Sequence, residues 1–202
     1  MILKGQAINL RDWQLDDLEA YAYWLRPEQR WQELDGPYYA KIQLAEIPGI
    51  VAQMREKIEV TAWPEPRQRL VIAQHDDDSL LGMVSWYWTS QETYWLSLGI
   101  SIYDPDNWGK GIGYEALGLW GDYLLAVMPQ LARLDLRTWS GNVGMMCLAQ
   151  KLGYREEARF RRARIVKGLY YDGMGYGVLR EEWQALYPDG FAAHLATLKG
   201  KE

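Results

Sequence analysis

The chain has 202 residues, of which 49% are hydrophobic and 24% charged, and its formal net charge is −5. This composition is typical of a globular protein and excludes a disordered or fibrous chain. The acidic balance argues against a protein that coats nucleic acid, and no run approaches the ~20 apolar residues of a membrane span.

The first residues lack the long apolar stretch of a signal peptide, so the cytoplasm is the expected compartment. The single cysteine, Cys147, excludes an intrachain disulfide and a cysteine-based zinc site, and His75 and His194 lie far apart in sequence. The aromatic residues comprise 11 Trp and 14 Tyr against 2 Phe. Such amphipathic rings suit either the walls of a pocket or a Trp-rich core.

The first half of the chain predicts one short strand, then two helices, then three further strands. The predicted strands cover residues 7–10, 70–73, 81–88 and 94–103, with an acidic turn at 76–79. The first helix carries apolar residues at helical spacing from Leu15 to Leu25 and ends before Pro27, and the second covers about 50–60.

The second half predicts helices that alternate with strands and then a hairpin. The predicted elements are a helix from about 111 to Pro129, a strand at 131–138, a helix from Asn142 to 152, a hairpin of strands 154–166 and 169–179, and two short final helices. The order β-α-α-β-β-β-α-β-α-β-β indicates a mixed α/β chain with two parallel crossovers. We expect one domain over 1–202, with a core at about 6–180 and a helical tail at 181–202.

Residues 107–113 read Asn-Trp-Gly-Lys-Gly-Ile-Gly between a predicted strand and a predicted helix. Three glycines at alternate positions allow backbone N–H groups to approach a ligand closely. The helix N-terminus adds a partial positive charge, and Lys110 adds a full one. The loop therefore predicts an anion site, most naturally for phosphate or pyrophosphate. A tight turn without a ligand would have the same sequence.

The loop fits neither of two common phosphate motifs. No Lys-Ser/Thr pair follows its last glycine, as a Walker loop requires. The G-x-G-x-x-G pattern that Gly111 and Gly113 begin ends at Ala116, and a dinucleotide site normally follows the first strand of a doubly wound fold. Here the loop lies in the middle of the chain.

Residues 108–113 resemble the acetyl-CoA loop of the GNAT N-acetyltransferase superfamily, whose pattern is Arg/Gln-x-x-Gly-x-Gly/Ala. Trp108 replaces the usual Arg or Gln. This departure, followed by Glu-Ala-Leu at 115–117, resembles the branch of the ribosomal-protein N-terminal acetyltransferases.

Two further motifs support the resemblance. Asn142, followed by Lys151, Gly153 and Tyr154, is similar to the Asn…Lys-x-Gly-Phe/Tyr motif of the same superfamily at the expected spacing. Leu-Arg at 10–11, ahead of an Asp-bearing helix, is a weaker match. Together the matches span roughly residues 6–180.

The resemblance implies a mostly antiparallel mixed sheet with splayed parallel strands, flanked by helices. It also implies direct transfer of an acetyl group from the co-substrate acetyl-CoA to an amine, without a metal. The strands expected to splay are about 98–103 and 131–138. The residues expected to bind acetyl-CoA are Ile102, Trp108, Gly109, Lys110, Gly111, Ile112, Gly113 and Asn142. Asn142 also suits a helix N-cap.

Amine acylation needs a neutral nucleophile, and a lysine-like amine has a pKa of about 10.4, so a base or water must take its proton. Ser97 stands where related proteins carry Glu, and it also reads as a pleat residue facing solvent. Asp104 ends the strand and also reads as a turn residue. With Tyr103, which could line the cleft, these are the candidate catalytic residues.

The positions that hold an acid in many related proteins hold Ala149 and Met145 here. A thiolate with a pKa of about 8.5 is a tolerable leaving group, so an acid is dispensable. A covalent intermediate on Cys147 is not expected, because a helix cysteine without a His partner usually packs.

The resemblance places the acceptor site at the first two helices and the hairpin near 167–168. Aromatic rings and carboxylates together favour a cation. Glu28, Glu33 and Asp35 are candidate partners, although a solvated loop explains them equally well. The aromatic residues of these regions are Trp13, Tyr21, Tyr23, Trp24, Trp31, Tyr38, Tyr39, Trp63, Tyr170 and Tyr171.

Three functions stay open on the sequence. The chain could acetylate a small cationic amine, acetylate a peptide or protein N-terminus, or bind acyl-CoA without catalysis. The expected partner is an amine-bearing acceptor, small molecule or peptide, and neither nucleic acid nor a membrane. A homodimer is left open.

Overall fold

The computed structural model describes residues 1–61 and 63–199. Eight strands form its sheet. The strands are β1 (Ile2–Lys4), β2 (Ile8–Arg11), β3 (Arg69–Gln74), β4 (Leu80–Ser90), β5 (Trp95–Ile102), β6 (Arg133–Trp139), β7 (Arg155–Val166) and β8 (Leu169–Leu179). Their order across the sheet is β1-β2-β3-β4-β5-β6-β8-β7.

Neighbouring strands are antiparallel except for β5 and β6, which run parallel. This confirms the predicted mixed, mostly antiparallel sheet. The two predicted crossovers run from β5 to β6 through α3 and from β6 to β7 through α4, and each joins two strands of the same direction. Only the first joins neighbours, because the hairpin strand β8 lies between β6 and β7.

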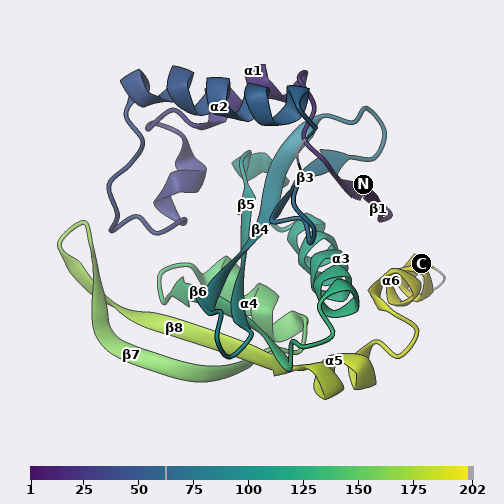
Figure 1. Ribbon diagram of the computed structural model, residues 1–202. Helices are drawn as coiled ribbons and strands as arrows, with labels where there is room; N and C mark the ends of the chain where they lie inside the picture. Colours follow the sequence, from purple (N-terminus) through teal and green to yellow (C-terminus); the bar gives the residue numbers. More distant parts are fainter. Residues whose placement is uncertain (62, 200–202) are drawn as a thin grey trace.

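Helices cover both faces of the sheet. They are α1 (Asp17–Trp24), α2 (Ile47–Glu59), α3 (Ile112–Val127), α4 (Val143–Lys151), α5 (Arg180–Leu186) and α6 (Phe191–Lys199), with short 3-10 turns η1 (Arg30–Glu33), η2 (Leu44–Glu46) and η3 (Pro105–Asn107). Figure 1 shows α1 and α2 together at one side of the sheet, α3 and α6 at the other, and the long β7–β8 hairpin reaching out below.

The two faces have separate hydrophobic cores. The first core lies between the sheet and α3 to α6, where Trp120 and Leu117 are fully buried. The second lies under α1 and α2, with Tyr103 at the end of β5 among its buried residues. Alternation along β5 explains the division, because Leu98 and Ile100 belong to the first core while Tyr103 belongs to the second.

Glu115 and Arg11, two residues of the motifs described above, fix the first residues of the chain against the rest of the fold. The carboxylate of Glu115, in the first turn of α3, accepts hydrogen bonds from the backbone N–H groups of Gln6, Ala7 (3.1 Å) and Ile8 (3.2 Å). Arg11 makes a buried bidentate ion pair with Asp17 at 2.8 Å for both contacts. These residues hold β2 and α1 in place around the site.

The boundaries differ from the sequence prediction mainly at the edges. β1 was not predicted, because three residues of an exposed edge strand give too short a pattern. The turns η1 and η2 were not predicted either. They divide the region between α1 and α2 into ordered pieces, which matters for the site below.

The predicted tail is structured as far as the description reaches. Trp183 of α5 and Phe191 of α6 are buried in the first core, and residues 200–202 of the predicted tail lie outside the described residues. Over residues 1–61 and 63–199, no helix combines the length and apolarity that crossing a bilayer requires. The same residues contain no cluster of three His, Cys, Asp or Glu side chains suited to a metal ion.

Candidate active site

The strands β5 and β6 separate at the centre of the sheet. They pair only at Ser97 with Asp135 and at Leu98 with Leu136. Beyond that point β5 continues against β4 and β6 continues against β8. A parallel pair that diverges in this way opens a gap in the sheet directly before the glycine loop.

The glycine loop between β5 and α3 has the backbone conformation that its sequence predicts. Gly109 (φ 74°) and Gly111 (φ 87°) adopt the left-handed region, which other residues resist. A methyl group built on either glycine would meet no atom within 4 Å, so the space beside them is open. Gly111 is also the N-cap of α3, whose first N–H groups lack partners within the helix.

The residues around these glycines anchor the loop. The indole Nε1 of Trp108 donates to the carbonyl oxygen of Ile102 at 2.9 Å. The side chain of Ile112 is buried in the first core. Gly113 faces Leu148 of α4, whose Cδ2 would lie 3.0 Å from an added Cβ, so this glycine allows α3 and α4 to pack closely.

The loop and gap fit the group that the resemblance implies. Open space next to left-handed glycines at a helix N-terminus suits the pyrophosphate of acetyl-CoA. Lys110 is exposed at the loop, and the ammonium of Lys151 lies 4.7 Å from the ring centre of Tyr114 in the first turn of α3. Both cations are therefore near an anion held there.

The structure places the three candidate catalytic residues in different surroundings. Ser97 lies where β5 and β6 still pair, is fully buried, and has its hydroxyl 3.0 Å from that of Thr89. It does not face solvent. The carboxylate of Asp104 accepts a hydrogen bond from the backbone N–H of Asp106 at 2.9 Å and thereby caps η3.

Tyr103 is 1% exposed and packs among aromatic rings of the second core. Its ring centre lies 5.2 Å from that of Trp31 and 6.1 Å from that of Trp24. Burial raises the pKa of the Tyr103 hydroxyl well above its usual value, and the charges of Tyr21 and Asp35 add to that effect. Its hydroxyl oxygen has no hydrogen-bond partner among the described residues.

Asn142 connects α4 to the loop between α1 and α2. Its Oδ1 accepts from the backbone N–H of Met145 at 3.0 Å, which is the predicted N-cap. Its Nδ2 donates to the carbonyl oxygen of Leu34 at 3.3 Å. The same carbonyl accepts from the indole Nε1 of Trp139, at the end of β6, at 3.0 Å.

The next residue, Asp35, reaches the other splayed strand. The Ser101 hydroxyl of β5 interacts with the Asp35 carboxylate. Burial raises the pKa of Asp35, and Ser101 partly opposes the shift. The Asp35 residue is nevertheless exposed to solvent, as expected for a carboxylate at the mouth of a cleft. The sequence suggested Asp35 only as a cation partner, because nothing in it shows that this loop crosses β5.

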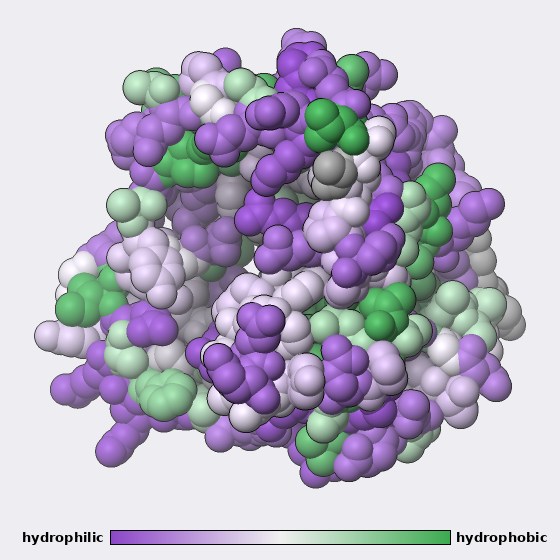
Figure 2. Space-filling model, viewed as in Figure 1, coloured by the Kyte–Doolittle hydropathy of each residue, from purple (hydrophilic) through white to green (hydrophobic). Residues whose placement is uncertain are grey.

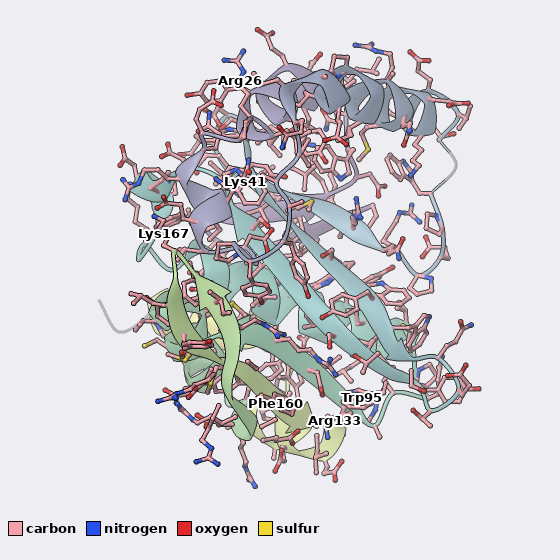
Figure 3. The ribbon with its side chains drawn as sticks, turned by 90° about the vertical axis from the view of Figure 1, so that its left-hand side faces the viewer. Arg26, Lys41, Trp95, Arg133, Phe160 and Lys167 are labelled. Atoms are coloured by element: carbon pink, nitrogen blue, oxygen red, sulfur yellow. The ribbon has the colours of Figure 1, made fainter. Side chains whose placement is uncertain are left out.

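Residues 30–43, here called the 30–43 loop, also meet the β7–β8 hairpin. The ammonium of Lys167 at the hairpin tip lies 3.2 Å from a carboxylate oxygen of Glu33, and the guanidinium of Arg164 lies 4.7 Å from the ring centre of Tyr38. Figure 3 shows Lys167 at the end of the hairpin and Lys41 on the loop above it, with Trp95 and Arg133 at the opposite end of the sheet.

Hollows lie near the 30–43 loop and near helices α1 and α2. A hollow of about 130 Å³ lies in the 30–43 loop and is lined by Trp31, Asp35, Tyr39 and Lys41 among others. A larger one of about 570 Å³ is lined only by residues from Leu15 to Ala22 and by Val51 and Arg55 of α2. Neither hollow is lined by β5 or β6. The smaller one includes Asp35, which directly follows Leu34, and the Leu34 carbonyl is bonded to Trp139 of β6, so we assign the smaller hollow to the site.

The aromatic residues predicted for the acceptor site lie partly in the second core and partly on the surface. Trp13, Tyr21 and Trp31 are buried in the second core, and Trp24 and Trp63 pack against it. The exposed members are Tyr23, Tyr39 and Tyr170. Tyr171 is half-buried and makes an edge-to-face contact with Trp139 at 4.8 Å between ring centres.

Comparison with known proteins identifies relatives of the whole chain. A family model described as an acetyltransferase (GNAT) domain matches residues 7–155. A curated relative from Bacillus subtilis (strain 168), the SPbeta prophage-derived uncharacterized N-acetyltransferase YokL, is 24% identical over 182 residues, covering 89% of this chain and 94% of the relative.

Solved structures share the fold at low sequence identity. A spermidine N-acetyltransferase SpeG chimera from Vibrio cholerae and hSSAT has a TM-score of 0.65 and 19% identity, with 88% of this chain and 98% of that chain covered. RimL, a ribosomal L7/L12 alpha-N-protein acetyltransferase solved in complex with coenzyme A, has a TM-score of 0.66 and 15% identity, with 89% and 98% covered. The family match spans most of the chain and agrees with the sheet and loop described above, so the chain belongs to the GNAT acetyltransferase family.

Proposed function

We propose that the protein transfers the acetyl group of acetyl-CoA to the primary amine of a small cationic molecule. The observation that carries the proposal is the gap between β5 and β6, which opens in front of an open glycine loop at the N-terminus of α3. Bound acetyl-CoA would supply an acetyl group activated as a thioester.

Different residues of the predicted cofactor set have different roles in this proposal. Backbone N–H groups of Gly109, Gly111 and the start of α3 would bind the pyrophosphate, with Lys110 adding charge. Trp108, Ile102 and Ile112 would hold the loop in shape, because each is bonded or packed to the scaffold. Asn142 would position α4 beside the cofactor, because both of its amide atoms already have protein partners.

The enclosed acceptor side supports a small acceptor over a peptide. The 30–43 loop is bonded to Trp139 and Asn142 on one side and meets the hairpin through Glu33 and Lys167 on the other. An extended peptide would have to separate these contacts. The SpeG chimera, a spermidine N-acetyltransferase, shares this fold, which supports a small cationic acceptor.

Calorimetry and a thiol-release assay test the proposal. We expect acetyl-CoA to bind the folded protein and small primary amines to release CoA thiol faster than peptides with a free N-terminus. Faster release with peptides would favour the N-terminal acetyltransferase function instead. Binding without release on any amine would favour an acyl-CoA-binding protein, and no binding at all would reject the cofactor.

A further inference from the structure

We propose that Asp35 binds the acceptor's ammonium group and takes its proton, and that the 30–43 loop holds this carboxylate across the splayed strands. The inference rests on the proposed acetyl transfer and deepens it, because it names the group that activates the amine.

The position of Asp35 follows from contacts on both sides of the gap. The carbonyl oxygen of Leu34 is fixed by two donors, Trp139 Nε1 at the end of β6 and Asn142 Nδ2 at the start of α4. The next side chain in the sequence, Asp35, meets the Ser101 hydroxyl of β5. Two consecutive residues therefore span the opening between the strands.

The other carboxylates suggested by the sequence are less well placed. Glu33 faces the hairpin and pairs with Lys167 at 3.2 Å, and Asp104 caps η3 through Asp106. Glu28 is exposed before η1, and no described contact ties it to β5 or β6. Asp35 is the carboxylate next to β5 beyond the point where β5 and β6 stop pairing.

The charges around Asp35 leave it available to a ligand. Lys41 lines the same hollow, but its ammonium donates to the carbonyl oxygen of Pro27 at 2.7 Å. Tyr103, directly after β5, is neutral because burial raises the pKa of its hydroxyl, and Arg164 of β7 lies over Tyr38. Among residues 1–61 and 63–199, no cation lies within salt-bridge distance of Asp35. An ammonium ligand would fill that role.

The proposed acetyl transfer needs one protein group, Asp35, to accept a proton from the acceptor's ammonium. Asp35 receives one proton from the ammonium, which frees the nitrogen lone pair, and later returns that proton to water. The new N–C bond forms as the thioester C–S bond breaks, and the second proton lost by the nitrogen goes to the leaving sulfur or to water. Burial of Asp35 makes its carboxylate a stronger base than an ordinary one, since it raises the pKa of the group.

The test compares Asp35→Asn with the wild type over a range of pH, using 1,5-diaminopentane as the acceptor. We expect kcat/KM near neutral pH to fall about 100-fold or more, as for loss of a general base. The wild type should show a plateau above the pKa of Asp35. The variant should instead gain activity steadily towards the amine's own pKa, about 10.4 for such a group, because only free amine then reacts.

Three comparisons distinguish a role of Asp35 as the base from a purely structural role. Acetyl-CoA affinity by calorimetry should be the same in Asp35→Asn and wild type. Asp35→Glu should recover part of the lost activity. The matched charge change Glu28→Gln should leave both the rate and the pH profile unchanged.

Two results would overturn the inference in distinguishable ways. Wild-type kcat/KM and an unchanged pH profile in Asp35→Asn would reject Asp35 alone and leave the acetyl transfer standing. A wild-type protein that binds acetyl-CoA but acetylates no amine would reject the transfer, and the inference with it.

Discussion

Gly111 shows how a single residue shapes the predicted cofactor site. Its left-handed conformation turns the chain into α3, and the space where a side chain would lie is open. In Gly111→Ala the alanine must adopt φ 87°, which costs about 1–2 kcal/mol, and its methyl group enters the space assigned to the cofactor. We expect acetyl-CoA affinity, measured by calorimetry, to weaken about 10-fold or more.

Gly168 provides a matched control for that substitution. It lies at the tip of the β7–β8 hairpin with φ 80°, and a methyl group there also meets no atom within 4 Å. Gly168→Ala therefore introduces similar backbone strain away from the loop. Equal acetyl-CoA affinities for the two alanine variants would contradict the proposed role of Gly111.

At single residues, the sequence predicted the structure well where a motif determines the backbone conformation. Gly109 and Gly111 adopt left-handed torsions, which a glycine-rich loop allows, and Asn142 is the predicted N-cap. The same reasoning did not reveal the surroundings of Ser97 and Tyr103. Both are buried: the Ser97 hydroxyl lies beside that of Thr89 on the neighbouring strand β4, and Tyr103 packs among aromatic residues that distant segments contribute to the second core.

At the scale of elements, the 30–43 loop is the part of the site that sequence could not supply. It has no regular period. Leu34 contacts the end of β6 and Asp35 contacts Ser101 of β5, while Glu33 and Tyr38 contact the β7–β8 hairpin. Strands and helices in the second half were predicted closely because their periodicity is strong. The family resemblance implied that β5 and β6 splay, and the structure adds where their pairing stops, after Leu98 and Leu136.

Trp139 links this loop to β6. Gly141 allows the arrangement, because a Cβ there would lie 1.8 Å from the Trp139 ring. Trp139→Phe removes the indole donor to Leu34 and keeps an aromatic ring against Tyr171. Loss of one such hydrogen bond is worth about 0.5–1.5 kcal/mol. We expect KM for the amine to rise about 3- to 10-fold, while kcat and acetyl-CoA affinity change little.

Trp95→Phe is the control for Trp139→Phe, because it makes the same change at a Trp far from the 30–43 loop. Trp95 begins β5, at the end of the sheet opposite the 30–43 loop, and lies near Arg133. Steady-state kinetics should show an unchanged KM for this variant. An equal rise in KM for both variants would indicate general damage to the sheet, and no rise in Trp139→Phe would contradict the positioning role of its indole.

At the scale of the whole molecule, the aromatic excess serves two purposes. Several Trp side chains, among them Trp120 and Trp183, fill the cores and donate their indole N–H to backbone or carboxylate oxygens. A smaller group lies at the 30–43 loop and the hairpin, where an acceptor would enter. Figure 2 shows hydrophobic residues scattered singly among hydrophilic ones on the face in view.

The net charge of −5 agrees with a cationic acceptor, since an acidic protein attracts cations over a distance. Length and composition alone could not distinguish this role from that of an ordinary acidic protein. The family model and two motifs in the correct order support the family assignment. The acceptor class is a proposal that rests on the contacts of the 30–43 loop with β6, α4 and the hairpin.

The most direct measurement is the identity of the product, determined by mass spectrometry after incubation with acetyl-CoA and 1,5-diaminopentane. The account predicts acetylated diamine in an amount equal to the CoA released, and strongly reduced product with Asp35→Asn near neutral pH. CoA release without acetylated amine, or no product despite measurable acetyl-CoA binding, would contradict it.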